Sequence, residues 1–217
     1  ISDGADVIIA KPGITSVKDL AGRRVGFEEG ALGRYMLTRA LELNGMKPDA
    51  VRTVNILIDD SVDAYQNDRV DAVVTFEPYR GQLLALDGVE IFNSKQLPNE
   101  IIDVLVIRAE YAEANPQTLR ALIKGWLDAA TLIKTAPETV AQDLAWYLKI
   151  PSTEVEAAFE GLTIPDAKQN HDMLGGREPI LLQNNGKIVS FMERQYQKPI
   201  HQLSYEIYTD RFVPKTD

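Results

Sequence analysis

The amino-acid sequence predicts an α/β fold built on a mainly parallel sheet. Three short apolar segments, at residues 25–27, 51–58 and 70–76, have the composition of buried strands. Segments with helical spacing of apolar residues separate them, which gives the order β-α-β-α-β within about fifty residues, and this order is typical of a parallel sheet. From residue 111 onward the chain turns predominantly helical.

The first expected strand covers residues 7–10 and follows a polar turn. Pro12 ends this strand, because proline cannot donate a hydrogen bond to a central ladder. Thr15 or Ser16 can then cap a short helical turn. Because a protein rarely starts on a buried strand, we expect that a portion upstream of Ile1 is missing from this chain.

Two glycines, Gly30 and Gly33, lie in the turn between the strand at residues 25–27 and a helix expected at residues 32–44. Glycine lets a ligand approach the backbone closely, and the first turn of a helix carries N–H groups without a partner inside the helix. Ligands of open α/β sheets bind outside the carboxyl ends of the strands. The turn is therefore a candidate ligand site, although a lone Gly-x-x-Gly pair more often marks only a tight turn.

Two further strands and a short helix complete the first half of the chain. The strands are expected at residues 90–92 and 101–108, and both are rich in β-branched and other apolar residues. Residues 59–61 are expected to cap a short helix that precedes the strand at residues 70–76.

The second half of the chain reads as a series of helices. Three of them are expected to begin at Pro116, Pro137 and Ser152. Trp126 and Trp146 lie on the apolar faces of the first two, and we expect both to pack in the core rather than stack on a ligand. A polar loop, a last long helix and an irregular or short helical tail are expected at residues 165–176, 179–197 and 203–213.

Composition places the chain among ordinary globular proteins and argues against several functions. The 217 residues are 45% hydrophobic and 25% charged, without an apolar run long enough for a membrane span. The net charge of −9 disfavours nucleic-acid binding, which requires a basic face. The absence of cysteine excludes disulfides, thiol catalysis and cysteine-ligated metal. The length suffices for one large domain or two small lobes.

No motif for catalysis or for metal binding occurs in the sequence. The two histidines, His171 and His201, form no His-x-x-His or Glu-x-x-His pair, so a zinc or di-iron site is not expected. None of the serines lies in a Gly-x-Ser-x-Gly motif. We therefore expect neither enzymatic activity nor a cofactor or metal.

Several motifs, taken in order along the chain, resemble one family. They include Asp-Gly-Ala-Asp before the first strand and Arg-Val-Asp-Ala-Val-Val-Thr-Phe-Glu-Pro-Tyr around a later one, and the full set covers residues 3–6, 14–26, 31–37, 69–79, 101–107 and 115–119. Their order and spacing resemble the substrate-binding proteins of bacterial ABC importers, in the nitrate/sulfonate/taurine and NMT1/THI5-like group. The resemblance covers nearly the whole chain.

This resemblance implies a type II periplasmic-binding-protein-like fold, in which two α/β lobes joined by hinge crossings close on a ligand. It implies that residues 14–86 form the second lobe, and that residues 1–13 and 87–217 supply the hinge strands, the remainder of the first lobe and the C-terminal helices. The hinge strands would lie at residues 7–11 and 89–93. Family members carry a β-α-β-α segment ahead of this region, so the N-terminal part of the first lobe is expected to be absent here.

Carboxylates follow two of the expected parallel strands. Glu28 and Glu29 follow the first, and Glu77 follows the third, where Pro78 directs the chain out of the sheet. In one parallel sheet these carboxylates can converge, although we expect one of Glu28 and Glu29 to be a solvated surface residue. A carboxylate beside a helix N-terminus favours a ligand with both donors and a partial negative end, rather than a bare oxyanion such as nitrate.

The resemblance places the ligand between the lobes and brings further segments into the candidate site. Asp103 lies in the strand expected at residues 101–108, where a buried structural carboxylate is an equally good interpretation. Tyr79 either lines the cleft or lies on the surface. The complete set of candidate ligand-binding residues is Asp3, Gly4, Ala5, Glu29, Gly30, Ala31, Leu32, Gly33, Glu77, Tyr79 and Asp103.

Two functions agree with these observations. The first is a periplasmic or lipid-anchored receptor that captures a small polar molecule and delivers it to an ABC permease; the second is an extracytoplasmic ligand-sensing domain of a signalling protein. A pyrimidine-synthase type of enzyme is disfavoured, because the cysteine-rich and histidine-bearing motifs of that branch are absent. The ligand classes that the resemblance implies are sulfonates, aminopyrimidines and other small polar nitrogen compounds.

Overall fold

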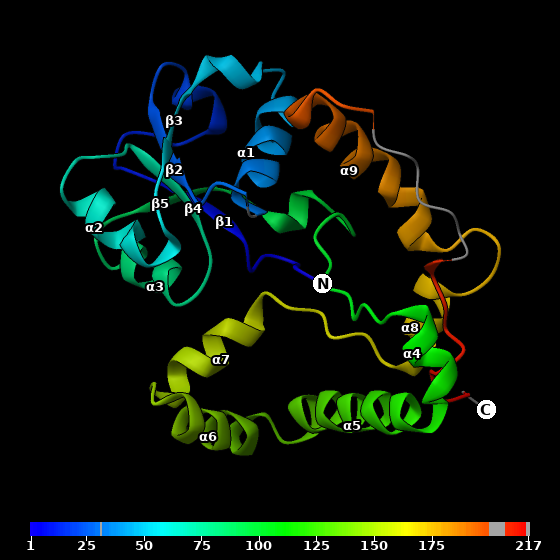
Figure 1. Cartoon of the computed structure of the whole chain (residues 1–217). Helices are drawn as coiled ribbons and strands as arrows, with labels where there is room; N and C mark the ends of the chain where they lie inside the picture. Colours follow the sequence, from blue (N-terminus) through cyan, green and yellow to red (C-terminus); the bar gives the residue numbers. More distant parts are fainter. Residues whose placement is uncertain (31, 200–206, 216–217) are drawn as a thin grey trace. The chain divides into compact units, whose positions relative to one another are not determined.

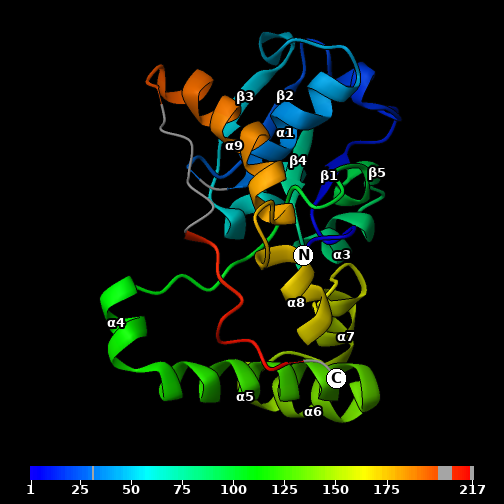
Figure 2. The ribbon, with the colours of Figure 1, turned by 90° about the vertical axis from the view of Figure 1, so that its right-hand side faces the viewer.

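The computed structural model describes residues 1–30, 32–199 and 207–215 and has the α/β class that the sequence predicts (Figures 1 and 2). The chain divides into two compact units, which are described separately. The sheet unit comprises Ser2–Ile101 and Leu144–Thr163, and the helical unit comprises Ile1, Ile102–Asp143 and Ile164–Asp217.

Five strands form one open sheet in the sheet unit, in the order β3-β2-β4-β1-β5 (Figure 1). Strand β2 runs parallel to β3 and β4, whereas β1 runs antiparallel to β4 and β5. The parallel strands are those expected from the alternation of strands and helices, so this prediction is confirmed. The strands are β1 (Val7–Ala10), β2 (Arg24–Phe27), β3 (Arg52–Asn55), β4 (Ala72–Thr75) and β5 (Val89–Asn93).

Helices cover both faces of the sheet. Residues Ile8 and Ala10 of β1 pack in one apolar cluster with α1, while Val7 and Ile9 pack in a second cluster with α2 and α3. All four residues of β1 are fully buried, which explains why this strand reads as a continuous apolar run rather than an alternating one. The helices of these two layers are α1 (Leu32–Leu43), α2 (Ser61–Gln66) and α3 (Tyr79–Leu84).

Short helical turns and longer helices make up the rest of the described chain. The one-turn 3₁₀ helices are η1 (Val17–Leu20), η2 (Pro48–Ala50), η3 (Ile58–Asp60) and η4 (Ser94–Gln96). The longer helices are α4 (Ala109–Ala114), α5 (Pro116–Thr135), α6 (Pro137–Leu148), α7 (Ser152–Glu160), α8 (Ala167–Leu174) and α9 (Ile180–Tyr196). None of the described helices combines the length and the apolar character that crossing a membrane requires.

The strand expected at residues 101–108 is absent, and this prediction is wrong. Residues 102–108 form neither helix nor strand, and no described segment pairs with them. A strand needs hydrogen bonds to a neighbour, and β-propensity alone does not supply that neighbour. Instead of being buried, Val104, Leu105 and Val106 are exposed, and Val106 retains 81% of its accessible surface.

The polar loop expected at residues 165–176 is also wrong, because most of it is helix α8. Asp166 caps this helix by accepting a hydrogen bond from the backbone N–H of Gln169 at 2.8 Å, and the Gln169 side chain accepts one from the Asp166 N–H at 3.0 Å. This reciprocal arrangement is a capping box. The tail expected at residues 203–213 lies partly outside the described residues. Its described part, from Ile207, contains no helix longer than a single turn.

The two tryptophans are exposed, contrary to the core packing expected of them. Trp126 retains 65% and Trp146 84% of the accessible surface. Helix α5 does bury one side of its apolar stripe, at Leu119 and Ala130, but Leu122 and Trp126 beside them remain uncovered. Helical periodicity predicts which residues share a face, and it does not predict how much of that face is covered.

We expect the isolated chain to self-associate through the uncovered stripe of α5, because contiguous exposed apolar surface promotes association. Trp126→Glu should shift the association to higher protein concentration, as measured by sedimentation velocity across a concentration series. Gln117→Glu adds the same charge at an exposed polar position of α5 and serves as the control. A chain that stays monomeric at every concentration, with and without the substitution, would contradict this expectation.

Candidate functional site

The candidate site lies at one edge of the sheet, where the parallel strands end. Strands β2 and β4 are neighbours, so the segments that follow Phe27 and Thr75 leave the sheet about 4.8 Å apart. Strand β1 begins at the same edge, because it is antiparallel to β4 and pairs Val7 with Thr75. The segments after β2, after β4 and before β1 therefore lie at the same edge of the sheet.

The glycine turn brings helix α1 close to β2. A Cβ atom on Gly33 would lie 2.8 Å from the Cβ of Phe27, so a larger residue would push the helix away from the strand. Gly30 has a φ of +80°, a conformation that glycine adopts readily. Leu32 is the first residue of α1 and is half-buried, whereas Ala31 lies outside the described residues. None of residues 32–35 is acidic, which leaves the helix N-terminus favourable to an anion.

Glu28 and Glu29 are both engaged within the protein. Arg34 donates to Glu29 through Nε at 2.6 Å and Nη2 at 2.5 Å, and its guanidinium lies 5.1 Å from the ring centroid of Phe27. The Glu29 N–H donates to Asn55 Oδ1 at 3.0 Å. Glu28 accepts a hydrogen bond at 3.3 Å from the backbone N–H of Ile58, in the segment that follows β3. Glu29 is the more exposed of the pair, as expected of one of them.

Glu77 is largely buried, with 10% of its side chain exposed, and it has two partners. Its Oε2 accepts the Gly81 N–H at 3.0 Å, and its Oε1 lies 3.2 Å from Nη1 of Arg80. Arg80 also donates to Glu90 at 2.9 Å. Burial alone would lower the pKa of Arg80, but the hydrogen bonds to Glu90 and Glu77 raise it, so this arginine is a permanent cation between two carboxylates.

Tyr79 joins the segment after β4 to the segment after β3. Its hydroxyl donates to Asp59, and this hydrogen bond, together with burial, raises the pKa of Tyr79. Its ring packs edge-to-face on Phe76 with the centroids 6.4 Å apart. Phe76 and Tyr79 therefore form an aromatic pair next to the carboxylates at this edge.

The backbone of Asp3, Gly4 and Ala5 is already hydrogen-bonded inside the sheet unit. Gly161 O accepts from the N–H of Asp3 at 2.8 Å and of Ala5 at 3.2 Å, and Ser94 Oγ accepts from the N–H of Gly4 at 2.7 Å. These N–H groups are therefore occupied. The Asp3 side chain is exposed and remains the part of this segment that can reach a ligand.

Asp103 is the one described candidate that belongs to the helical unit. It lies in the segment that forms no strand, and it is exposed. The interpretation of Asp103 as a buried structural carboxylate is therefore wrong, because the strand that would have buried it is absent.

Sequence reasoning missed the cations of this site. Arg80 follows Glu77 by three residues at the start of α3, a spacing that favours an ion pair and could have been recognised. The pairing of Arg34 with Glu29 spans a turn and has no periodic signature. With both carboxylates paired to guanidinium groups, this edge presents charges of both signs, so the expected repulsion of a bare oxyanion is weaker than the sequence indicates.

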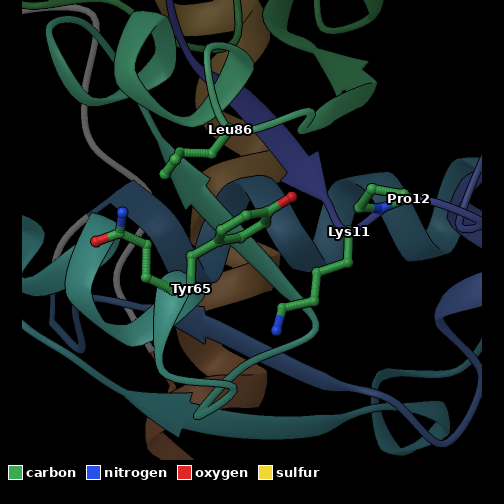
Figure 3. Close-up of a pocket in the computed structure, with 5 residues that line it drawn as sticks. Lys11, Pro12, Tyr65 and Leu86 are labelled. Atoms are coloured by element: carbon green, nitrogen blue, oxygen red, sulfur yellow. The ribbon is translucent and has the colours of Figure 1, made fainter.

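A shallow pocket of about 430 Å³ lies at the other edge of the sheet and is not part of this site (Figure 3). It is lined by Lys11, Pro12, Tyr65, Gln66 and Leu86, and Lys11 follows the end of β1 that pairs with the start of β4. The Lys11 ammonium lies 5.5 Å from the Tyr65 ring centroid. It also forms an ion pair with Asp68, which does not line the pocket. Within the described part of the chain, no cluster of three metal-ligating side chains occurs.

Comparison with known proteins identifies a family and several relatives of this chain. Residues 5–140 match the family model described as NMT1/THI5 like. The chain is 25% identical over 221 residues to the taurine-binding periplasmic protein of Escherichia coli (strain K12), an alignment that covers 96% of this chain and 67% of that protein. This chain thus spans about two thirds of that relative's length.

Solved structures share the fold. The periplasmic aliphatic sulphonate binding protein SsuA from Escherichia coli superposes with a TM-score of 0.71 at 19% identity, over 96% of this chain and 72% of that one. The desulfurization enzyme DszB superposes with a TM-score of 0.63 at 15% identity, over 98% and 75%. At these identities the likeness shows the fold alone, a periplasmic-binding-protein fold that occurs in a binding protein and in an enzyme. The family model, in contrast, matches more than half of the sequence, and the chain belongs to the NMT1/THI5-like family.

Proposed function

We propose that this chain belongs to a solute receptor that captures a small polar molecule between its two predicted lobes and delivers it to an ABC permease. The relatives found by sequence include a taurine-binding periplasmic protein and a putative aliphatic sulfonates-binding protein, which supports a solute-binding role. The observation that supports the proposal is that two carboxylate–guanidinium pairs, Glu29 with Arg34 and Glu77 with Arg80, follow neighbouring parallel strands at the edge of the sheet where α1 begins. An extracytoplasmic location, periplasmic or lipid-anchored, is part of the same proposal.

The proposed ligand is an amino-sulfonate or a similar small molecule with a cationic and an anionic end. A sulfonate offers three acceptor oxygens, which suit the N–H groups of the first turn of α1 and a guanidinium such as Arg34. An ammonium group suits a carboxylate such as Glu77 or the exposed Asp3. The name of the taurine-binding relative supports this class, because taurine carries both groups.

The candidate residues divide by the part of the ligand that they would contact. Gly30, Leu32 and Gly33 would offer backbone at the helix N-terminus, Glu29 and Glu77 would offer carboxylates, and Tyr79 would offer an aromatic surface. The N–H groups of Gly4 and Ala5 already donate hydrogen bonds within the protein, so these two residues would contact the ligand through other backbone atoms. Asp103 remains a proposed contact that depends on the helical unit.

Glu77→Gln should weaken taurine binding by about 1.5–3 kcal/mol, because it removes the charge from a hydrogen bond to the ligand ammonium. Isothermal titration calorimetry with taurine and with ethanesulfonate, which lacks the amine, would measure this. We expect a large loss for taurine and a small one for ethanesulfonate. Glu42→Gln, on the distant part of α1, is the matched control.

Two outcomes would contradict the proposal. An unchanged taurine affinity in Glu77→Gln would remove this residue from the site. Failure of the unaltered protein to bind taurine, alkanesulfonates, nitrate or an aminopyrimidine would remove the receptor function itself.

Stimulation of the cognate transporter's ATPase by the liganded protein, in reconstituted vesicles, would distinguish delivery to a permease from the alternative role as a sensing domain.

A further inference from the structure

The C-terminal strap, defined as residues 207–215, is attached to helix α8 of the helical unit through one histidine (Figure 1). Nδ1 of His171 lies 2.7 Å from Oδ2 of Asp210, and its Nε2 lies 2.9 Å from the carbonyl oxygen of Pro214. Between these two points, Phe212 is buried in a small apolar cluster with Ala112 and Leu119. The same imidazole ring thus contacts the strap at two points, Asp210 and Pro214.

The two partners of His171 determine its protonation state. The Pro214 carbonyl can only accept a hydrogen bond, so Nε2 must carry a proton. The Asp210 carboxylate is also an acceptor, so Nδ1 must carry a proton as well. Both ring nitrogens are protonated only in the imidazolium form. The observed geometry is therefore that of a charged histidine.

The surroundings of His171 favour this charge. The hydrogen bond to Asp210, followed by that to Pro214, raises the pKa of His171 above the ordinary 6.5. Asp172, its neighbour on α8, acts in the same direction, and partial burial opposes both. Helix α9 packs against α8, and the groups that raise the pKa of His171 most come from residues 207–215 and from α8 itself. His171 also lies in the last turn of α8, where a cation is favourable.

The strap fits closely where it meets α8. A Cβ atom on Gly175 would lie 2.7 Å from Oδ2 of Asp210, so glycine at this position leaves the room that the aspartate occupies. Arg211 and Arg120 each place a guanidinium over the ring of Phe212, at 4.5 and 5.9 Å from its centroid. Phe212 packs with Ala112 and Leu119, and the contacts of His171 to Asp210 and Pro214 lie on either side of it in the strap.

We propose that residues 207–215 are a pH-sensitive strap, which the His171 imidazolium holds on α8 and which is released when His171 loses its proton. Neutral His171 has one N–H and can keep the contact to Pro214 or to Asp210, but not both. Because folding raises the pKa of His171, the strap contributes stability that is complete below the pKa of the unfolded chain, near 6.5, and is lost as pH rises through the folded-state value. Release uncovers the site of Phe212 on Ala112 and Leu119.

The first measurement is the titration of His171 by NMR. The sequence contains two histidines, so His201→Gln leaves a single imidazole to follow. We expect a titration midpoint above the ordinary histidine value, and a downward shift of that midpoint when Asp210→Asn removes the carboxylate. An ordinary or lowered midpoint in the unaltered strap would overturn the proposal.

The second measurement is tryptic cleavage after Arg211, which cuts within the strap and is quantified by mass spectrometry. Cleavage is compared between about pH 5.5 and about pH 9, on either side of the ordinary histidine pKa. The reference is His171→Gln, in which we expect the strap to be released at every pH. Relative to this variant, cleavage of the unaltered protein should rise several-fold as the pH increases. The ratio cancels the pH dependence of trypsin itself. Lys168→Gln breaks the exposed 2.8 Å ion pair with Asp172 on the same helix and should behave as the unaltered protein does. A ratio that stays constant with pH would overturn the proposal.

Discussion

Replacing Glu100 with alanine should lower the free energy of unfolding by about 3–5 kcal/mol, the usual cost of removing one partner from a buried charge pair. The Glu100 side chain is 3% exposed. Its Oε2 accepts hydrogen bonds from the Tyr35 hydroxyl and from Nε of Arg39, both at 2.8 Å, and its Oε1 accepts from Nη2 of Arg39 at 3.2 Å. Glu100 therefore ties α1 to the segment that follows η4.

The cost arises from the groups that Glu100 leaves behind. Arg39 is mostly buried and would keep Glu42 as its carboxylate partner at the rim. Tyr35 is buried, and burial, reinforced by the hydrogen bond to Glu100, raises its pKa, so the hydroxyl stays protonated and requires an acceptor. A buried donor without its acceptor costs about 1–3 kcal/mol by itself. The substitution therefore removes the carboxylate that pairs with Arg39 and that accepts the hydrogen bond of the Tyr35 hydroxyl.

Glu42→Ala is the matched control, because it removes a carboxylate from the same arginine at a more exposed position. Exposed ion pairs contribute at most about 1 kcal/mol, so this variant should be only slightly destabilised. Urea denaturation followed by far-UV circular dichroism measures both, with the m-value as a check that the transition is the same. Equal losses for the two variants would mean that the Glu100 network is no more than a surface interaction.

Strands β1 and β4 could be predicted from sequence because they are buried on both faces. Val7 to Ala10 and Ala72 to Val74 are continuous apolar runs, and covered strands have that pattern. The position of the candidate site followed from the strand ends and the glycines. Its guanidinium partners did not follow, because the ion pair between Glu29 and Arg34 depends on how the turn folds.

Two of the errors have a common physical cause, which is that a local pattern does not contain its partner. Residues 101–108 have strand composition, but no strand of the described chain pairs with them, so they stay outside the sheet. The stripe of α5 is apolar, yet Trp126 is uncovered, because periodicity does not say what packs against a face. Helix α8 was missed for another reason: its capping signal, Asp166 and Gln169, was present in the sequence, but the polar composition between them resembles a loop.

Gly161→Ala should lower the free energy of unfolding by roughly 3–5 kcal/mol, which combines overpacking of about 1–3 kcal/mol with two weakened hydrogen bonds of about 1 kcal/mol each. A Cβ atom on Gly161 would lie 2.3 Å from the nitrogen and 2.5 Å from the Cα of Ala5. These are backbone atoms, so the contact cannot be relieved by turning a side chain. The φ of Gly161 is −96°, which any residue adopts, so close contact rather than backbone strain causes the loss.

The same substitution would move a segment of the candidate site. Gly161 O holds the N–H groups of Asp3 and Ala5, immediately ahead of β1, so a displaced Gly161 releases the Asp3 side chain from its position. Gly125→Ala is the matched control, because no atom of the described residues lies within 4 Å of the added methyl and alanine favours the helix by about 0.5–1 kcal/mol. Thermal or urea denaturation should therefore show that the free energy of unfolding falls in Gly161→Ala and rises in Gly125→Ala. Amide hydrogen exchange of Asp3 and Ala5 should accelerate only in Gly161→Ala. If Gly161→Ala were as stable as Gly125→Ala, the turn after α7 would not be what fixes the backbone ahead of β1.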